Sequence, residues 1–248
     1  MICKEYRRIV NNADTAVLFI HGILGTPDHF KEFIPLIPEN FSIHNIVLDG
    51  HGKGIMDFAH TSMRIWETQT EAVFTALAET HRNIILVGHS MGTLLSIDLA
   101  VKYPHKVSAL FLLNVPLTPM VAPASIRHSY RVLFDKVRKN RPDEVAAKEA
   151  YGIQVDRRLW LYPLWIPRFL ELFAKARKAQ KILPIINVPV TAYQSSKDEL
   201  VSMRSEKILL KHPNITTKSL SHSSHYLYAD IDKKLLTSDF TELCNKFI

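Results

Sequence analysis

The sequence predicts an α/β fold, in which a mostly parallel sheet is covered by helices on both faces. Apolar, β-branched runs recur along the chain with helical stretches between them, which is the pattern of strands buried on both sides. With 248 residues and 47% hydrophobic content, the chain is long enough for a full core. One internal stretch interrupts the alternation, and it predicts a helical insertion in an otherwise continuous α/β unit.

The expected elements alternate between strand and helix over the first 113 residues. Ile65, Thr68, Ala72, Thr75 and Ala76 are expected on the buried face of the long second helix. A reduced early strand is expected at 5–10 and further strands at 15–20, 45–48, 83–87 and 107–113, with helices at 28–37, 61–81 and 93–103. The alternation resumes with strands at 188–194 and 215–220 and helices at 199–211 and 231–247.

Residues 114–184 break this alternation. The stretch opens with Pro116, Pro119 and Pro123 and continues as amphipathic, basic and aromatic helix without a strand-like run. We therefore expect residues 1–113 and 185–248 to form one core, and residues 114–184 to be a helical insertion between two strands of its sheet.

The excess of positive over negative charge is confined to this insertion. The net charge is +7, yet residues 124–181 alone hold 14 Lys/Arg and 6 Asp/Glu, whereas the remainder holds 17 basic and 18 acidic residues. Such a surface is suited to steering anionic substrates or to transient contact with a lipid surface, and a solvated basic face explains it equally well. No base-stacking motif accompanies the charge, so we expect no nucleic-acid partner.

Several protein classes are disfavoured by composition. No segment reaches the roughly 18 apolar residues of a membrane span, and residues 1–10 are charged and lack the apolar stretch of a signal peptide, which predicts a cytoplasmic protein. Cys3 and Cys244 lie far apart in the sequence and are expected to be reduced and structural. No Cys/His cluster has zinc-binding spacing, so we expect no metal.

Residues 84–92 carry the strongest functional signal. They read Ile-Ile-Leu-Val-Gly-His-Ser-Met-Gly, an apolar strand that runs into Gly-x-Ser-x-Gly and then into a helical stretch. A strand, a sharp turn and a helix lift a serine hydroxyl out of the backbone, and Gly88 and Gly92 relieve the crowding at that turn. We predict that Ser90 is a nucleophile; the alternative is a turn serine that bonds its own backbone.

A serine nucleophile needs a base, usually His, and an acid that orients the base. In a doubly wound hydrolase the acid and then the histidine follow late strands. Asp198 and Glu199 both follow the strand at 188–194, and we favour Asp198 because Glu199 resembles the first-turn acid of the next helix. His222 and His225 both follow the strand at 215–220, and spacing alone leaves both open; His225, which borders the last helix, is preferred.

Acyl transfer also requires hydrogen-bond donors for the oxyanion. One donor is expected to be the backbone N–H of Met91, directly after the serine. The other is expected from the loop His21-Gly22-Ile23-Leu24-Gly25-Thr26-Pro27, where Ile23 N–H is the candidate. A plain glycine turn is the alternative for this loop. His51, in the later Asp-Gly-His-Gly turn, is assigned no chemistry.

Taken together, these motifs resemble the α/β-hydrolase superfamily, in particular the group of bacterial carboxylesterases and monoacylglycerol lipases. The matching segments are residues 21–27, 48–52, 88–92, 197–201 and 224–225 with Asp230 beyond, and they run in the family's order over nearly the whole chain. The resemblance implies the α/β-hydrolase fold, supports His225 over His222, and implies that residues 114–184 are a cap. Two departures are Thr93, where many members have another glycine, and the short N-terminal region.

The expected function is therefore a serine hydrolase that cleaves carboxylic esters, with medium-chain or monoacylglycerol-like substrates, through an acyl-enzyme intermediate and without a cofactor. The resemblance implies that the cap walls the substrate pocket, and the predicted apolar contacts are Val121, Ile126, Leu133, Trp160 and Trp165. The alternative for each of these side chains is that it only packs the cap onto the core.

Competing functions remain open at this point. A thioesterase or another Ser-His-Asp acyl hydrolase of small molecules has the same catalytic residues. A non-catalytic binding protein on the same fold is the alternative from another class. Haloalkane dehalogenases and epoxide hydrolases need Asp as the nucleophile, and Ser90 argues against both.

Overall fold

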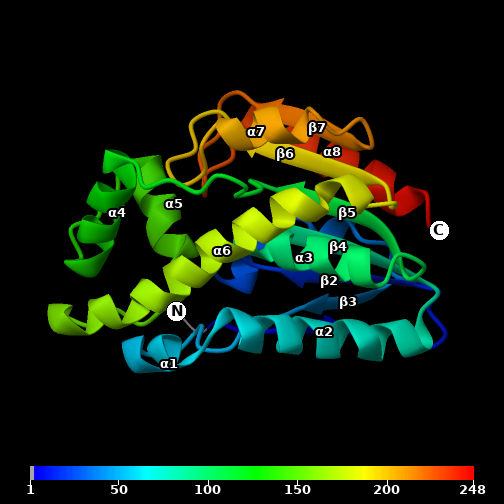
Figure 1. The fold of residues 1–248 in the computed structure, drawn as a ribbon, viewed down its shortest axis with the longest axis horizontal. Coiled ribbons are helices and arrows are strands. Elements are labelled where there is room, and N and C mark those ends of the chain that lie inside the picture. The colour runs from blue at the N-terminus through cyan, green and yellow to red at the C-terminus, as the bar shows by residue number, and fades with distance from the viewer. Residues whose placement is uncertain (1–2) are drawn as a thin grey trace.

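The computed structural model describes residues 3–248 and contains a seven-stranded sheet (Figure 1). The strand order is β1-β3-β2-β4-β5-β6-β7, with β1 antiparallel to β3 and every other pair parallel. This confirms the predicted α/β fold. The strands are β1 Tyr6–Arg8, β2 Thr15–Ile20, β3 Ser42–Asn45, β4 Asn83–His89, β5 Val107–Leu113, β6 Val190–Ser195 and β7 Ile215–Leu220.

Strand β3 begins and ends earlier than expected. It pairs with β2 through Ser42 to Asn45, whereas the sequence pattern favoured residues 45–48. The apolar residues Ile46 and Leu48 are fully buried all the same. These two residues are therefore buried in the segment that follows β3, outside the strand. A prediction based on hydrophobicity placed the strand too late for that reason.

Helices cover both faces of the sheet, although their lengths differ from those predicted. Helix α2 (Met63–Thr80) buries Met63, Trp66 and Phe74. The prediction that Ile65, Thr68 and Ala72 face the core is wrong, because all three are exposed. The bulky side chains, not the run of small ones, define the buried stripe. The other helices of the core are α1 Ile55–His60, α3 Met91–Lys102, α7 Arg204–Leu209 and α8 Asp230–Asn245, with short 3₁₀ turns η1 Pro27–Phe30 and η2 Ile34–Leu36 in place of one helix at 28–37.

Successive residues of β2 point into two different cores. Leu18 and Ile20 pack in the cluster beneath α2 and α3, whereas Val17 and Phe19 pack against residues of η1, η2 and α8. A parallel strand buried on both faces requires such a continuous apolar run. Both cores hold the sheet rigid, and its carboxyl edge carries the loops described below.

Residues 114–184 contain helices and no strand, and they leave the sheet between β5 and β6 (Figure 1). Their elements are α4 Pro123–Leu133, α5 Pro142–Ala150, η3 Leu159–Trp165, α6 Ile166–Ile182 and η4 Leu183–Ile185. Helix α6 runs across α3, and its Leu172, Ala176 and Ala179 belong to the core cluster. The second half of α6 thus packs as part of the helical layer, and the division at residues 114 and 184 stays a prediction. In residues 3–248, no helix is long and apolar enough to cross a membrane.

Candidate active site

Ser90 occupies the sharp turn between β4 and α3. Its backbone has φ 51° and ψ −123°, a strained conformation for a residue with a side chain. The Ser90 N–H donates to Leu113 O at 2.9 Å, and the Thr93 hydroxyl donates to Ser90 O at 2.6 Å. Thr93, a departure from the family pattern, therefore stabilises the turn that presents the serine.

Two glycines allow the backbone to close around Ser90. A Cβ on Gly92 would lie 1.9 Å from Ile20 O, and a Cβ on Gly22 would lie 2.8 Å from the Cβ of Ser90. Both distances are shorter than any side chain tolerates. Helix α3 and the loop after β2 consequently meet at the serine only because these positions lack side chains.

Asp198 and His225 come together at the carboxyl edge of β6 and β7. His225 Nδ1 lies 2.7 Å from Asp198 Oδ2, and both side chains are buried. Asp198 Oδ1 accepts the N–H groups of Leu200 and Val201 at 2.8 Å each, which fixes the carboxylate. With Nδ1–H donated to Asp198, the other ring nitrogen of His225 is left as a proton acceptor.

Two opposing effects set the pKa of His225. Burial lowers it, but the charge of Asp198 and the hydrogen bond to it, followed by the charge of Glu199, raise it, and the net result is a raised pKa. The imidazolium is thus stabilised in the folded protein. An imidazole that holds a proton well in this position suits a general base.

The alternative acid and base have different surroundings. The His222 side chain is 58% exposed, and its Nδ1 lies 3.9 Å from Asp232 Oδ1. Glu199 is buried and accepts the His225 N–H at 3.2 Å, so the expectation that it opens a helix is wrong; α7 begins at Arg204. The Asp198 carboxylate bonds the backbone that would have formed that first turn.

Two buried histidines shape the loop after β2, a role that the sequence did not indicate. His21 donates from Nδ1 to Gly22 O and accepts the Leu48 N–H at Nε2, while His51 Nε2 accepts the Leu24 N–H at 3.1 Å. Burial lowers the pKa of His51 to about 4 and that of His21 well below its usual value, so both rings are neutral. They fix the loop that carries Ile23.

The two candidate oxyanion donors come from different elements. Met91 is the first residue of α3, and Ile23 lies in the loop after β2. Within residues 3–248 neither backbone N–H donates a hydrogen bond to the protein. Both remain available for an oxygen bound beside Ser90.

A cavity of about 540 Å³ contains Ser90 and His225 in its lining. Most of its other lining side chains are aliphatic or aromatic. Among the predicted contacts, Val121, Ile126 and Leu133 line it, and so does Ile23. Helix α6 adds Phe169, Leu172 and Phe173, whose i, i+3, i+4 spacing is the sequence signal that could have identified them.

The two predicted tryptophans lie outside this lining. Trp165 is buried and donates from Nε1 to Ile55 O at 3.0 Å, with its ring against Phe58. Trp160 is 72% exposed. Trp165 therefore attaches the insertion to α1, and neither ring lines the cavity that contains Ser90 and His225.

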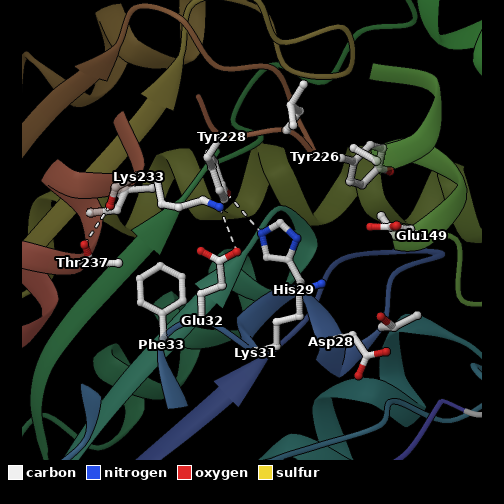
Figure 2. A pocket seen from close by; sticks show the side chains of 15 residues that line it. Asp28, His29, Lys31, Glu32, Phe33, Glu149, Tyr226, Tyr228, Lys233 and Thr237 are labelled. Atoms are coloured by element: carbon white, nitrogen blue, oxygen red, sulfur yellow. Dashed lines mark hydrogen bonds and ion pairs between the residues drawn. The ribbon is translucent and has the colours of Figure 1, made fainter. Parts of the chain in front are cut away.

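A second cavity of about 400 Å³ lies between η1, α5 and α8, and Figure 2 shows its charged lining. Glu32 and Lys233 form an ion pair at 2.8 Å, and His29 lies 3.1 Å from the Tyr228 hydroxyl. Tyr226 lines both cavities. In the described part of the chain, no group of three or more His, Cys, Asp or Glu residues is arranged to hold a metal ion.

Comparison with known proteins finds the same fold. The family model described as "alpha/beta hydrolase fold" matches residues 15–149. A pyrethroid hydrolase of Sphingobium wenxiniae is 33% identical over 111 residues, which are 44% of this chain and 39% of the relative. A putative esterase/lipase of Haemophilus influenzae is 26% identical over 46% of this chain and 39% of its own length. The matched stretch thus spans about two fifths of each of these relatives.

Solved structures match over nearly the whole chain. A metagenome-derived lipolytic enzyme superposes with a TM-score of 0.75 at 19% identity, covering 99% of this chain and 98% of the other. The monoacylglycerol lipase of Paleococcus ferrophilus superposes with a TM-score of 0.68 at 16% identity, covering 99% and 100%. At such identities the likeness establishes the fold.

Proposed function

Because the chain belongs to the α/β hydrolase fold family, we propose that it is a serine hydrolase that cleaves carboxylic esters through an acyl-enzyme intermediate. One observation carries the proposal: Ser90, on a strained turn, and His225, held by Asp198 at 2.7 Å, line the same largely apolar cavity. A nucleophile, a base and room for an acyl chain meet there.

In the proposed reaction, His225 accepts the proton of the Ser90 hydroxyl as the oxygen attacks the ester carbonyl carbon. The N–H groups of Ile23 and Met91 stabilise the oxyanion of the tetrahedral intermediate. His225 then donates its proton to the departing alcohol, which leaves an acyl group on Ser90. Water, deprotonated by His225, cleaves that acyl-enzyme and regenerates the serine.

The shape and polarity of the cavity support an apolar acyl group. Val121, Leu133 and Phe173 surround a volume of about 540 Å³, which lies within the roughly 300–1,000 Å³ typical of small-molecule sites. We propose medium-chain acyl esters or monoacylglycerol-like esters as substrates.

The rim of the cavity also supports transient contact with a lipid surface. Val121 is 65% exposed and Ile126 61% exposed, although both line the cavity, and the exposed Arg127 follows Ile126 on helix α4. Apolar side chains beside cations suit an anionic membrane surface. Co-sedimentation with phosphatidylglycerol vesicles, but not with phosphatidylcholine vesicles, is expected; no binding to either would contradict this part.

A series of p-nitrophenyl esters tests the reaction and the acyl preference. Turnover is expected to rise from acetate to hexanoate or octanoate, because longer chains bury more apolar surface. A fluorophosphonate probe is expected to label the wild type and not Ser90→Ala. Activity confined to acetate would contradict the lipid-like substrate, and labelling that survives Ser90→Ala would contradict the nucleophile.

A further inference from the structure

The backbone of His225 is held on both sides by buried side chains. Its carbonyl oxygen accepts from His89 Nε2 at 3.1 Å and from Asn114 Nδ2 at 3.2 Å. Its N–H donates to Glu199 Oε2 at 3.2 Å. The position of the ring relative to Ser90 therefore depends on these contacts as well as on Asp198.

Glu199 differs from the other two groups because it brings a second carboxylate to the base. Its side chain is buried, with only 9% exposed to solvent. A carboxylate buried to this degree is costly unless an opposite charge or hydrogen bonds compensate it. One oxygen is satisfied by His225, and the other requires a partner.

The inserted segment supplies that partner. His128, on α4 and also buried, places Nδ1 3.7 Å from Glu199 Oε1, and its Nε2 lies 3.3 Å from Asp143 Oδ2 on α5. His128 thus lies between two carboxylates, those of Glu199 and Asp143. Within residues 3–248, His128 Nδ1 makes no hydrogen bond, and it faces Glu199 Oε1.

Backbone hydrogen bonds fix the start of the insertion to the same loop. Ala122 N–H donates to Glu199 O at 3.1 Å, and Met120 N–H donates to Leu200 O at 2.8 Å. Pro119 and Val201 form an isolated antiparallel bridge. The chain that enters α4 therefore cannot shift without moving the loop that carries both acidic residues.

We propose that Glu199 is a positioning residue for His225, and that His128 couples its hold on the base to the placement of helix α4. The inference rests on the proposed function, because it assigns a role within that reaction. Asp198 orients the ring, Glu199 holds the backbone beneath it, and the insertion that walls the cavity supports Glu199.

This role makes a distinctive prediction about pH. The groups facing His225 are Asp198 and Glu199 from the loop after β6, His89 from β4, His29 from η1 and its neighbour Tyr226. The groups facing Glu199 from the insertion are His128 and, beyond it, Asp143. The charge of Glu199 raises the pKa of His225, so its removal must lower that pKa. The acid limb of the kcat/KM profile then moves to lower pH.

The first experiment compares Glu199→Gln with Glu199→Ala in the full chain, with a p-nitrophenyl ester as substrate. Glutamine keeps an acceptor for the His225 N–H but loses the charge, so its acid limb is expected at lower pH with a small loss of plateau kcat/KM. Alanine also loses the hydrogen bond, and kcat/KM is expected to fall about 10- to 100-fold. Glu242→Gln, whose native side chain is 73% exposed, is the matched control and should not change the profile.

The second experiment tests His128 by a double-mutant cycle. His128→Ala is expected to lower kcat/KM several-fold in the wild-type background and to have little further effect on Glu199→Gln. His105→Ala, at an exposed position, is the control. Additive losses would contradict the coupling to α4.

The outcomes separate this inference from the proposed function. A wild type without ester hydrolysis and without fluorophosphonate labelling contradicts the proposed function. An active wild type whose Glu199→Gln profile superimposes on that of Glu242→Gln contradicts the role of Glu199 alone. If Glu199→Gln does not fold, Glu199→Asp replaces it: the shortened carboxylate should lower kcat/KM, and an unchanged value overturns the proposal.

Discussion

The carboxyl edge of the sheet and the inserted segment are built in opposite ways. At the edge, Ser90 is strained and clamped by backbone hydrogen bonds, and Asp198 and His225 are buried. In the insertion, Val121, Ile126 and Trp160 are more than half exposed, and the local charge excess is +8, from 14 basic and 6 acidic residues between 124 and 181. The edge is therefore buried and hydrogen-bonded, whereas the insertion presents exposed apolar and basic side chains.

The buried histidines near the carboxyl edge differ in the direction of their pKa shifts. Among the histidines at the edge, burial and neighbouring histidines lower the pKa of His29 to about 3, and burial lowers that of His89 well below its usual value. His225 is the exception, because Asp198 and Glu199 oppose the effect of burial. Of these three histidines, His225 is the one whose pKa is raised.

Replacing the proposed nucleophile should abolish the activity located at the sheet edge while leaving the cavity lining of the insertion unchanged. Ser90→Ala is expected to lower kcat by at least about 10⁴-fold, the scale observed when such a nucleophile is lost. The ester substrate should still bind, because the apolar lining is unchanged. Steady-state kinetics and equilibrium binding of a non-hydrolysable ester analogue measure the two effects. Residual activity above one per cent of the wild type would contradict the proposed nucleophile.

Asp198→Asn should lower kcat almost as much as Ser90→Ala does. The amide neither stabilises the imidazolium nor enforces the productive tautomer, and about a 10³- to 10⁴-fold loss of kcat is expected. The native charge raises the pKa of His225, so neutralising it lowers that pKa. The acid limb of the residual activity should therefore move to lower pH. A limb that moves to higher pH would show that another group controls the base.

A methyl group on Gly92 should damage the fold at the edge. The new Cβ would lie 1.9 Å from Ile20 O. Neither atom can rotate away as the end of a flexible side chain could, so α3 must move away from β2. We expect Gly92→Ala to lower the free energy of unfolding by about 3 kcal/mol and to reduce fluorophosphonate labelling. Gly54→Ala, where the nearest atom is Asp57 Oδ2 at 3.5 Å, is the control for denaturant unfolding.

Substitutions in the insertion should have the smallest effects and should change selectivity. Phe173→Ala enlarges the cavity and is expected to change the octanoate-to-acetate ratio of kcat/KM by about 3- to 10-fold, as expected for losing apolar contact with the acyl chain. Trp160→Ala removes an exposed ring outside the lining and should leave the ratio unchanged. A larger effect at Trp160 than at Phe173 would reverse our assignment of the pocket wall.

The sequence by itself determined the alternation of elements and the order of the candidate catalytic residues. Strands β2 and β5 have the expected bounds, and the α/β fold is confirmed, because strands buried on both faces need continuous apolar runs. Parallel strands also end at one edge, so residues after β4, β6 and β7 are brought near each other by topology. Ser90, Asp198 and His225 are predictable for that reason, and their roles stay predictions.

Tertiary structure alone decided which side chains face one another across elements. Trp160 and Trp165 are alike in the sequence, yet one is exposed and the other donates a hydrogen bond to Ile55. Glu199 looked like a helix-start residue and instead holds the His225 backbone. A local sequence pattern indicates only the periodicity along one element. These contacts depend on how the insertion packs on the sheet, which brings together residues that are far apart in the chain.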